Sequence, residues 1–128
     1  MRLYVETAGG TFAVDLESEE VEPVDVELER EAPLVLNLPR VVASAAAGAT
    51  VVALVDAKPP LLVSRDAGAT WTAAGRGLPP GFAIAVAADD PDTIAYAARN
   101  RVYLSRNGGV FWSAIPVELP DVVALELD

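Results

Sequence analysis

The sequence predicts an all-β fold, and three observations support this class. Short apolar runs recur along the chain and are separated by Gly, Pro, Asn and Asp residues, the pattern of strands and turns. This order of runs and turns repeats with a period of 41 residues. The chain has 128 residues, 52% of them hydrophobic, which is enough for one core and too few for two. We therefore predict a single all-β domain over residues 1–128, built from repeated units.

The period follows from paired motifs. The stretch SRDAGATW at 64–71 is followed 41 residues later by SRNGGVFW at 105–112. The Leu-Pro pair at 78–79 returns at the same interval at 119–120, and an earlier pair stands at 38–39. Three units therefore open alike, with LPRVVASAAAG, LPPGFAIAVAAD and LPDVVALELD. The third of these units is interrupted by the end of the chain.

Each unit contains four short apolar runs. In the unit 78–118 they are FAIAVAA, TIAYAA, RVYLS and VFWSAI, separated by DDPD, RN and RNGG. Four strands in roughly 40 to 50 residues is typical of a propeller blade, a twisted antiparallel sheet that buries both faces against its neighbours. We name the predicted strands a to d from the inside of the blade outward.

The first complete unit, 38–77, opens on the Ala-rich run VVASAAAGA. Alanine also favours helix, so a helix is the alternative for this run. The run occupies the same register as FAIAVAA in the next unit, and small residues suit inner strands that crowd near a propeller axis. We therefore expect strand a here.

The missing strands of the third unit stand at the amino terminus. RLYVET fits strand b, GTFAVDL fits strand c, and VEPVDVELE alternates apolar and acidic residues as a half-buried strand d does. Residues 1–37 are thus predicted to supply strands b to d of a split blade, and residues 119–128 its inner strand. The chain is expected to be a half-propeller of three blades.

Known propellers close with about four to eight blades, so three blades leave the ring open. We expect each terminal blade to expose an apolar face and the inner strand 122–127 to lack its partner. Two copies would form a six-bladed ring in which the carboxy-terminal strand of each chain completes the blade begun by residues 2–30 of the other. The predicted partner is therefore a second copy, in a homodimer held by terminal strands.

The motif SRDAGATW resembles the Asp-box, or BNR, repeat S-x-D-x-G-x-T-W of sialidases, sortilin-like receptors and photosystem assembly factors. The resemblance covers residues 38–128 well and residues 1–37 poorly. The first copy matches in full, and the second has asparagine for aspartate and phenylalanine for threonine. The matching positions are Ser64, Asp66, Gly68, Thr70 and Trp71, then Ser105, Asn107, Gly109 and Trp112.

The residues of the motif predict a hairpin between strands c and d. A short Asp or Asn side chain caps backbone donors of the turn, glycine adopts a positive φ, and tryptophan packs beneath. In families with this motif the hairpin lies opposite the catalytic pocket, so we interpret these residues as structural. The resemblance places a ligand face at the other end of the blades, where these residues would gather: Asp56, Lys58, Arg76, Arg99, Asn100 and Arg101.

Composition removes several classes of function. The chain has no cysteine and no histidine, so disulfides, thiolate metal sites and the usual neutral-pH acid or base are absent, and we predict neither a metal nor a cofactor. A formal net charge of −10 disfavours nucleic acid. No apolar run has the length of a membrane span or a signal peptide, so we expect a cytoplasmic protein that does not bind a membrane.

Two alternative interpretations remain open beside a non-catalytic binding or assembly module. A degenerate, sialidase-like glycoside hydrolase would use arginines with a tyrosine such as Tyr96 or Tyr103, or paired carboxylates such as Asp89 and Asp90, although Pro91 makes DDPD a turn. A carbohydrate-binding lectin would stack sugars on exposed tryptophans. The partner could thus be a protein or a glycan.

The acidic segment 17–31 holds eight of the nineteen carboxylates. It could bind Ca²⁺ or a basic partner, but a solvated outer strand whose charges prevent edge pairing explains it more simply.

Overall fold

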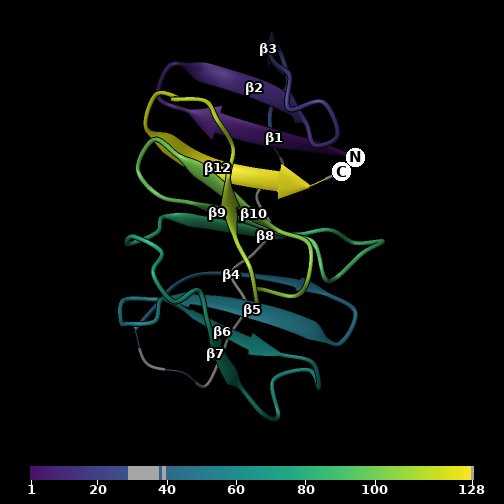
Figure 1. Cartoon of the computed structure of the whole chain (residues 1–128), viewed down its shortest axis with the longest axis vertical. Helices are drawn as coiled ribbons and strands as arrows, with labels where there is room; N and C mark the ends of the chain where they lie inside the picture. Colours follow the sequence, from purple (N-terminus) through teal and green to yellow (C-terminus); the bar gives the residue numbers. More distant parts are fainter. Residues whose placement is uncertain (29–37, 39, 128) are drawn as a thin grey trace.

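The computed structural model describes residues 1–28, 38 and 40–127 (Figure 1). The all-β prediction is confirmed for these residues, which form twelve strands and no helix. The strands are β1 (Arg2–Thr7), β2 (Gly10–Asp15), β3 (Val21–Val24), β4 (Val41–Ala47), β5 (Thr50–Val55), β6 (Leu61–Ser64), β7 (Thr72–Ala74), β8 (Ala83–Val86), β9 (Ile94–Ala97), β10 (Val102–Ser105), β11 (Ser113–Ala114) and β12 (Val122–Leu127).

The strands form three four-stranded antiparallel sheets with a propeller-like arrangement. The first blade has the order β4-β5-β6-β7, and the second has the order β8-β9-β10-β11. The split blade joins the two ends of the chain in the order β12-β1-β2-β3. Each sheet therefore runs from an a strand to a d strand as the repeat predicts.

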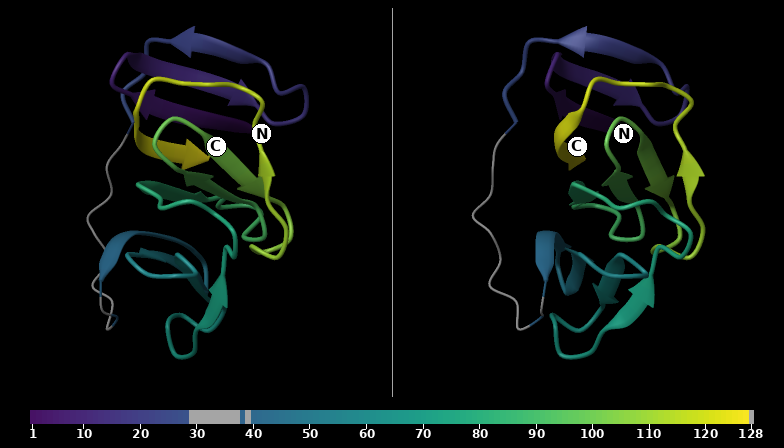
Figure 2. Two further views of the ribbon diagram at one scale, coloured as in Figure 1. Left: turned by 60° about the vertical axis from the view of Figure 1, so that its left-hand side comes forward. Right: turned by 90° about the vertical axis from the view of Figure 1, so that its left-hand side faces the viewer.

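The three blades lie side by side with the second blade in the middle (Figures 1 and 2). Its inner strand β8 contacts both β4 of the first blade and β12 of the split blade. The inner strands are thus adjacent, and the outer strands β3 and β7 lie at the two ends of the molecule (Figure 1).

The Ala-rich run forms strand β4 and not a helix. It pairs with β5, where Ala43 faces Leu54 and Ala45 faces Val52 across the ladder. Ala43 and Ala45 are half-buried against the core between the first and second blades. The small side chains let β4 approach β8, so tertiary contact overrides the helix propensity of alanine.

Two cores fill the spaces between the blades. Between the first and second blades, buried side chains from β5, β6, β8 and β9 meet: Val52, Leu54, Leu61, Val63, Ile84, Ile94 and Tyr96. Between the second blade and the split blade, the core draws on both chain ends and includes Leu3, Val5, Val14, Leu16, Ala95, Ala97, Val102, Leu104 and Val122. Alternation along each strand places these residues on the faces that meet.

The split blade is completed within the single chain, so the expectation that the inner strand 122–127 lacks its partner is wrong, and an exchange of these strands between two copies stays a prediction. β12 pairs with β1 of the same chain, with Leu3 opposite Leu127 and Val5 opposite Leu125, and the register shifts between Glu6 and Thr7. The two ends of the chain lie together in this blade (Figure 1). Because the termini meet, β12 has its partner without a second copy.

The expectation of a broad apolar outward face is wrong for the split blade. Leu3 and Val5 face the second blade, so the alternate residues Tyr4 and Glu6 lie on the outward face. Tyr4 lies opposite Glu126 on β12, which adds a carboxylate to this face. The outward face of the split blade therefore carries charged and polar side chains among small apolar ones such as Ala13 and Ala124.

The outward face of β5 in the first blade also differs from the expectation. Val51, Ala53 and Val55 alternate with the side chains that face the second blade, yet they are 8%, 0% and 6% exposed. They are buried in the single chain and so present no open apolar surface. The predicted strand d at 21–29 is shorter than expected, since β3 ends at Val24, and its residue 29 lies outside the described part of the chain.

Candidate functional site

The first turn motif joins β6 to β7 and is closed by the side chains of Ser64 and Asp66. The buried Ser64 hydroxyl donates to Asp66 Oδ1 (2.7 Å) and accepts from the backbone N–H of Gly68 (2.8 Å) and of Asp66 (3.3 Å). Asp66 Oδ1 accepts from the N–H of Thr70 (2.8 Å), and Oδ2 accepts from the Thr70 hydroxyl (2.5 Å). The polar groups of this motif thus form hydrogen bonds with one another.

These bonds hold Asp66 in its charged form. The Thr70 hydroxyl, the Thr70 N–H and the Ser64 hydroxyl lower the pKa of Asp66 from 3.8 to about 2. All three donors favour the carboxylate over the acid. Asp66 is therefore an acceptor within its turn and no proton donor near neutral pH.

The second turn motif, between β10 and β11, repeats this network with an amide. The Ser105 hydroxyl donates to Asn107 Oδ1 (3.0 Å) and accepts from the N–H of Gly109 (2.9 Å). Asn107 Oδ1 accepts from the N–H of Phe111 (3.0 Å). Phe111 stands in place of threonine, so the side-chain donor is lost, and its own ring is 74% exposed. The second turn keeps the shape of the first without its charge.

The two tryptophans pack against these turns, as expected, and are half-buried. Trp112 Nε1 donates to the carbonyl of Gly109 (2.9 Å), and its ring meets Tyr96 edge-on at 6.0 Å. Gly68 and Gly109 have φ of +94° and +92°, and a Cβ on either would lie 3.6 Å from the tryptophan of its own turn. These glycines supply the positive φ that the turns require.

An arginine in each turn reaches the neighbouring blade, a role that the sequence reasoning did not identify. Arg65 Nη1 lies 3.1 Å from Asp92 Oδ1 of the second blade, and its guanidinium occupies the space where a Cβ on Gly108 would stand. Arg106 Nη2 donates to the carbonyl of Leu16 in the split blade (2.9 Å). Arg65 and Arg106 occupy the same position of the repeated motif, and this could have suggested a common role. Their partners could not be predicted, because they are distant in sequence.

The corresponding turn of the split blade is built differently. Asp15 Oδ1 accepts from the N–H groups of Glu17 (2.9 Å) and Ser18 (3.2 Å). The backbone donors of Ser18 and Glu17 lower the pKa of Asp15. The turn is thus capped by a carboxylate without the motif's serine.

Three residues of the predicted ligand face form contacts with the connection that leads into β12. Arg99 Nε lies 3.3 Å from Asp121 Oδ1, and Arg101 Nη2 lies 3.3 Å from Glu118 Oε1. The carbonyl of Asn100 accepts from the N–H of Leu119 (3.1 Å). The side chains of Arg99 and Arg101 remain partly exposed, but each forms an ion pair with an acid of the same chain.

The other three residues of the predicted face lie in separate loops. Asp56 and Lys58 lie in the loop between β5 and β6, where the N–H of Asp56 donates to the carbonyl of Arg40 (3.0 Å). Arg76 follows β7 and lines a groove on another part of the surface. Within the described residues, no hydrogen bond or ion pair joins these three to Arg99 or Arg101, and a common ligand face formed by all six stays a prediction.

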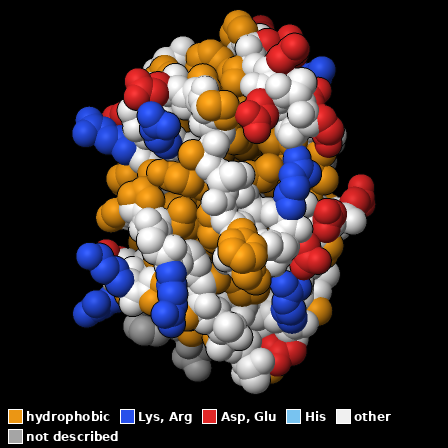
Figure 3. Space-filling model, viewed as in Figure 1, with side chains coloured by type: hydrophobic (Ala, Val, Ile, Leu, Met, Phe, Trp, Pro, Cys, Tyr) orange, Lys and Arg blue, Asp and Glu red, His pale blue; other side chains and the backbone are white. Residues whose placement is uncertain are grey.

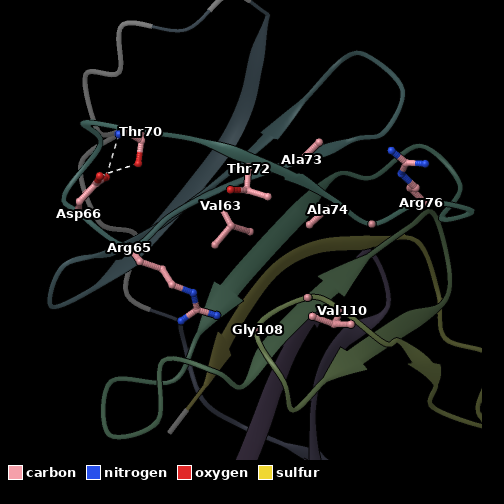
Figure 4. A pocket seen from close by; sticks show the side chains of 12 residues that line it. Val63, Arg65, Asp66, Thr70, Thr72, Ala73, Ala74, Arg76, Gly108 and Val110 are labelled. Carbon is pink, nitrogen blue, oxygen red and sulfur yellow. Dashed lines mark hydrogen bonds between the residues drawn. The ribbon is translucent and has the colours of Figure 1, made fainter.

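The groove runs along β7 and measures about 540 Å³ (Figure 4). Residues 72–76 of the first blade form one wall, and residues 108–110 of the second turn form the other. Arg76 lies at one end of the labelled side chains and Asp66 with Thr70 at the other (Figure 4). The groove is completed by Val63 and Arg65.

The groups considered for catalysis are engaged in the scaffold. The Tyr96 hydroxyl donates to the carbonyl of Pro79 (2.6 Å), and burial, with Tyr103 nearby, raises the pKa of Tyr96 to about 12. Asp90 accepts from the N–H of Asp92 (3.3 Å) and the Thr93 hydroxyl (2.9 Å) in the turn before β9. Among the described side chains, no three carboxylates are placed to hold a metal ion.

Charge is distributed unevenly over the surface. On the face seen in Figure 3, acidic side chains gather over the split blade and along one side, and basic side chains lie mostly over the first and second blades. Hydrophobic side chains reach the surface between them (Figure 3).

In the described part of the chain there is no helix of the length and apolarity that a membrane crossing needs.

Comparison with solved structures shows a similarity to part of a longer enzyme. The fold is similar to that of a GH74 enzyme from Niastella koreensis, with a TM-score of 0.54 and 26% sequence identity. The match covers 97% of this chain and 20% of that enzyme, so the chain spans about a fifth of its length. No family model and no curated protein matches the sequence. The chain is thus similar to part of a much longer, propeller-type glycoside hydrolase.

Proposed function

We propose that this protein is a non-catalytic binding or assembly module made of three propeller blades, two of which carry Asp-box-like turns. The observation that carries the proposal is the internal pairing of its polar side chains. Asp66 is saturated by Thr70 and Ser64. The arginines 99 and 101 are paired with acids of the same chain. Among the described residues, Tyr96 and Asp90, which were considered for catalysis, are likewise engaged in hydrogen bonds within the scaffold.

We further propose that the module joins other blades to complete a ring, in the simplest case those of a second copy. Support comes from the similarity to one fifth of a longer enzyme and from the three blades lying side by side. Closure would bring the charged outward face of the split blade against the first blade of the other copy. Contacts between such faces are polar, so the ring would be held partly by ionic interactions.

Sedimentation equilibrium of the full chain tests the assembly proposal. A mass of twice 13.4 kDa supports the six-bladed ring, and a monomer at all concentrations contradicts it. A panel of chromogenic glycosides tests the absence of catalysis, since hydrolysis above the uncatalysed rate would contradict it.

Glycoside hydrolysis is the second candidate function, because the similar GH74 enzyme is a glycoside hydrolase. The similarity covers only part of that enzyme, so its activity is not carried over to this chain. Carbohydrate binding without hydrolysis is less favoured, because the indole N–H of Trp112 is already bonded to Gly109 and both tryptophans are half-buried. A glycan array separates this alternative from a protein-binding role.

A further inference from the structure

β7 is the outermost strand of the first blade, so only one of its edges is paired within the sheet. In an antiparallel edge strand, alternate N–H and C=O groups point away from the sheet and can pair with another strand. Residues 72–76 line the groove consecutively, so the backbone of this edge contributes to its wall. Thr72 and Ala73 are exposed and carry no charge that would prevent pairing.

The opposite wall suits a backbone with small apolar side chains. Gly108 and Gly109 contribute no side chain and are themselves buried. Val110 is 70% exposed at the groove, and Val63 is buried beneath it. Exposed apolar side chains beside an open strand edge are typical of a surface that binds a partner.

The charges of the groove favour a carboxylate at one end. Arg65 is already paired with Asp92, and Asp66 is bonded within its own turn. Arg76 is exposed, and no described residue forms an ion pair with it. A ligand that lies along the groove would therefore gain most from a negative group beside Arg76 (Figure 4).

We propose that the groove binds an extended peptide segment that adds to β7 as a fifth strand, with small apolar side chains against Val63 and Val110 and an acidic side chain at Arg76. The main chain would supply affinity through the ladder, and the alternate side chains would supply specificity. This inference rests on the proposed binding function and names the class of partner.

Fluorescence anisotropy with a labelled synthetic peptide tests the proposal on the full chain. The probe has a Val-Ala-Val centre with a glutamate at the end that would lie beside Arg76 and an uncharged residue at the other end. Arg76→Glu should weaken its binding by about tenfold or more. The substitution replaces the attraction between Arg76 and the glutamate of the peptide with repulsion between two carboxylates. Arg40→Glu makes the same substitution at an exposed arginine outside the groove and should alter binding less than about twofold.

A second probe tests the strand pairing itself. The same peptide with alternate backbone amides N-methylated cannot form the ladder along one edge and should lose most of its affinity. The proposal is overturned if the parent peptide does not bind, if the two charge variants bind it equally, or if N-methylation has no effect. A failure of peptide binding leaves the mass and glycoside results unchanged, so the proposed function is judged separately.

Discussion

Asp66 and Asn107 stand at the same position of two equivalent turns and differ in one ionisable group. Both accept a backbone N–H four residues later, from Thr70 and from Phe111. Both also accept from the serine two residues before them. The shape of the turn therefore depends on the acceptor oxygen, and only the first turn adds a dependence on pH.

Acid should weaken the first turn. The pKa of Asp66 is about 2 in the folded chain and 3.8 ordinarily, so its contribution to stability is present above pH 4 and is lost as the pH falls towards 2. Asp66→Asn should flatten the dependence of stability on pH in this interval, measured by urea unfolding at several pH values. Asn107→Asp should steepen it, and equal pH profiles for all three proteins would contradict the role of Asp66.

The buried serine hydroxyls contribute to both turns. Ser64 and Ser105 are each 1% exposed and bridge the acceptor side chain to a glycine N–H. Ser64→Ala and Ser105→Ala should each lower the free energy of unfolding by about 1–3 kcal/mol, because they leave these groups unpaired. Ser18→Ala is the control, since Ser18 is exposed, and it should change stability by less than about 0.5 kcal/mol.

At the scale of elements, β12 and β1 join the two ends of the chain into one sheet. β12 also contacts β8, so it links the split blade to the second blade. Val122 is buried at the start of β12, while the next residue, Val123, is 47% exposed. Adjacent residues of one strand thus differ in their contribution to the fold.

Replacing each of these two valines with aspartate should distinguish how much the buried side chain and the strand pairing each contribute to the free energy of unfolding. Val122→Asp places a carboxylate in the core and should destabilise the protein by about 3 kcal/mol, whereas Val123→Asp should cost less than about 1 kcal/mol. Chemical denaturation measures both values. Similar losses for the two variants would show that the buried side of β12 does not anchor the split blade.

At the scale of the whole molecule, the outward faces of the two terminal blades differ. The outward face of the split blade carries Arg2 and Glu22, 3.7 Å apart, with Glu126 opposite Tyr4. The outward residues of β5 are apolar but buried. A second copy that closed the ring would therefore meet a charged face on one side of each contact.

Salt should weaken such a ring. Ionic contacts at a partly exposed interface are screened, because the Debye length falls from about 10 Å at 0.1 M salt to about 3 Å at 1 M. We expect the dimer dissociation constant, measured by analytical ultracentrifugation, to rise by about tenfold over this range. A dimer that tightens with salt would point to apolar contact, as the sequence alone had led us to expect.

The sequence by itself determined the strands, the turns and their grouping into three sheets. These features are local or periodic: the repeat of 41 residues places SRDAGATW and SRNGGVFW in equivalent hairpins, and alternation defines each strand. Even the assignment of residues 2–24 and 122–127 to one sheet followed from the order of units.

Only the tertiary structure decided what closes the split blade, which charges are paired and where a groove forms. The ends of the chain lie close enough for β12 to pair with β1, and the acids at 118 and 121 reach the arginines predicted to bind a ligand. Arg65 and Gly108 meet across two blades, although the sequence separates them by more than one repeat. Such contacts depend on how the sheets pack in three dimensions, and a periodic pattern carries no information about side-chain partners between repeats.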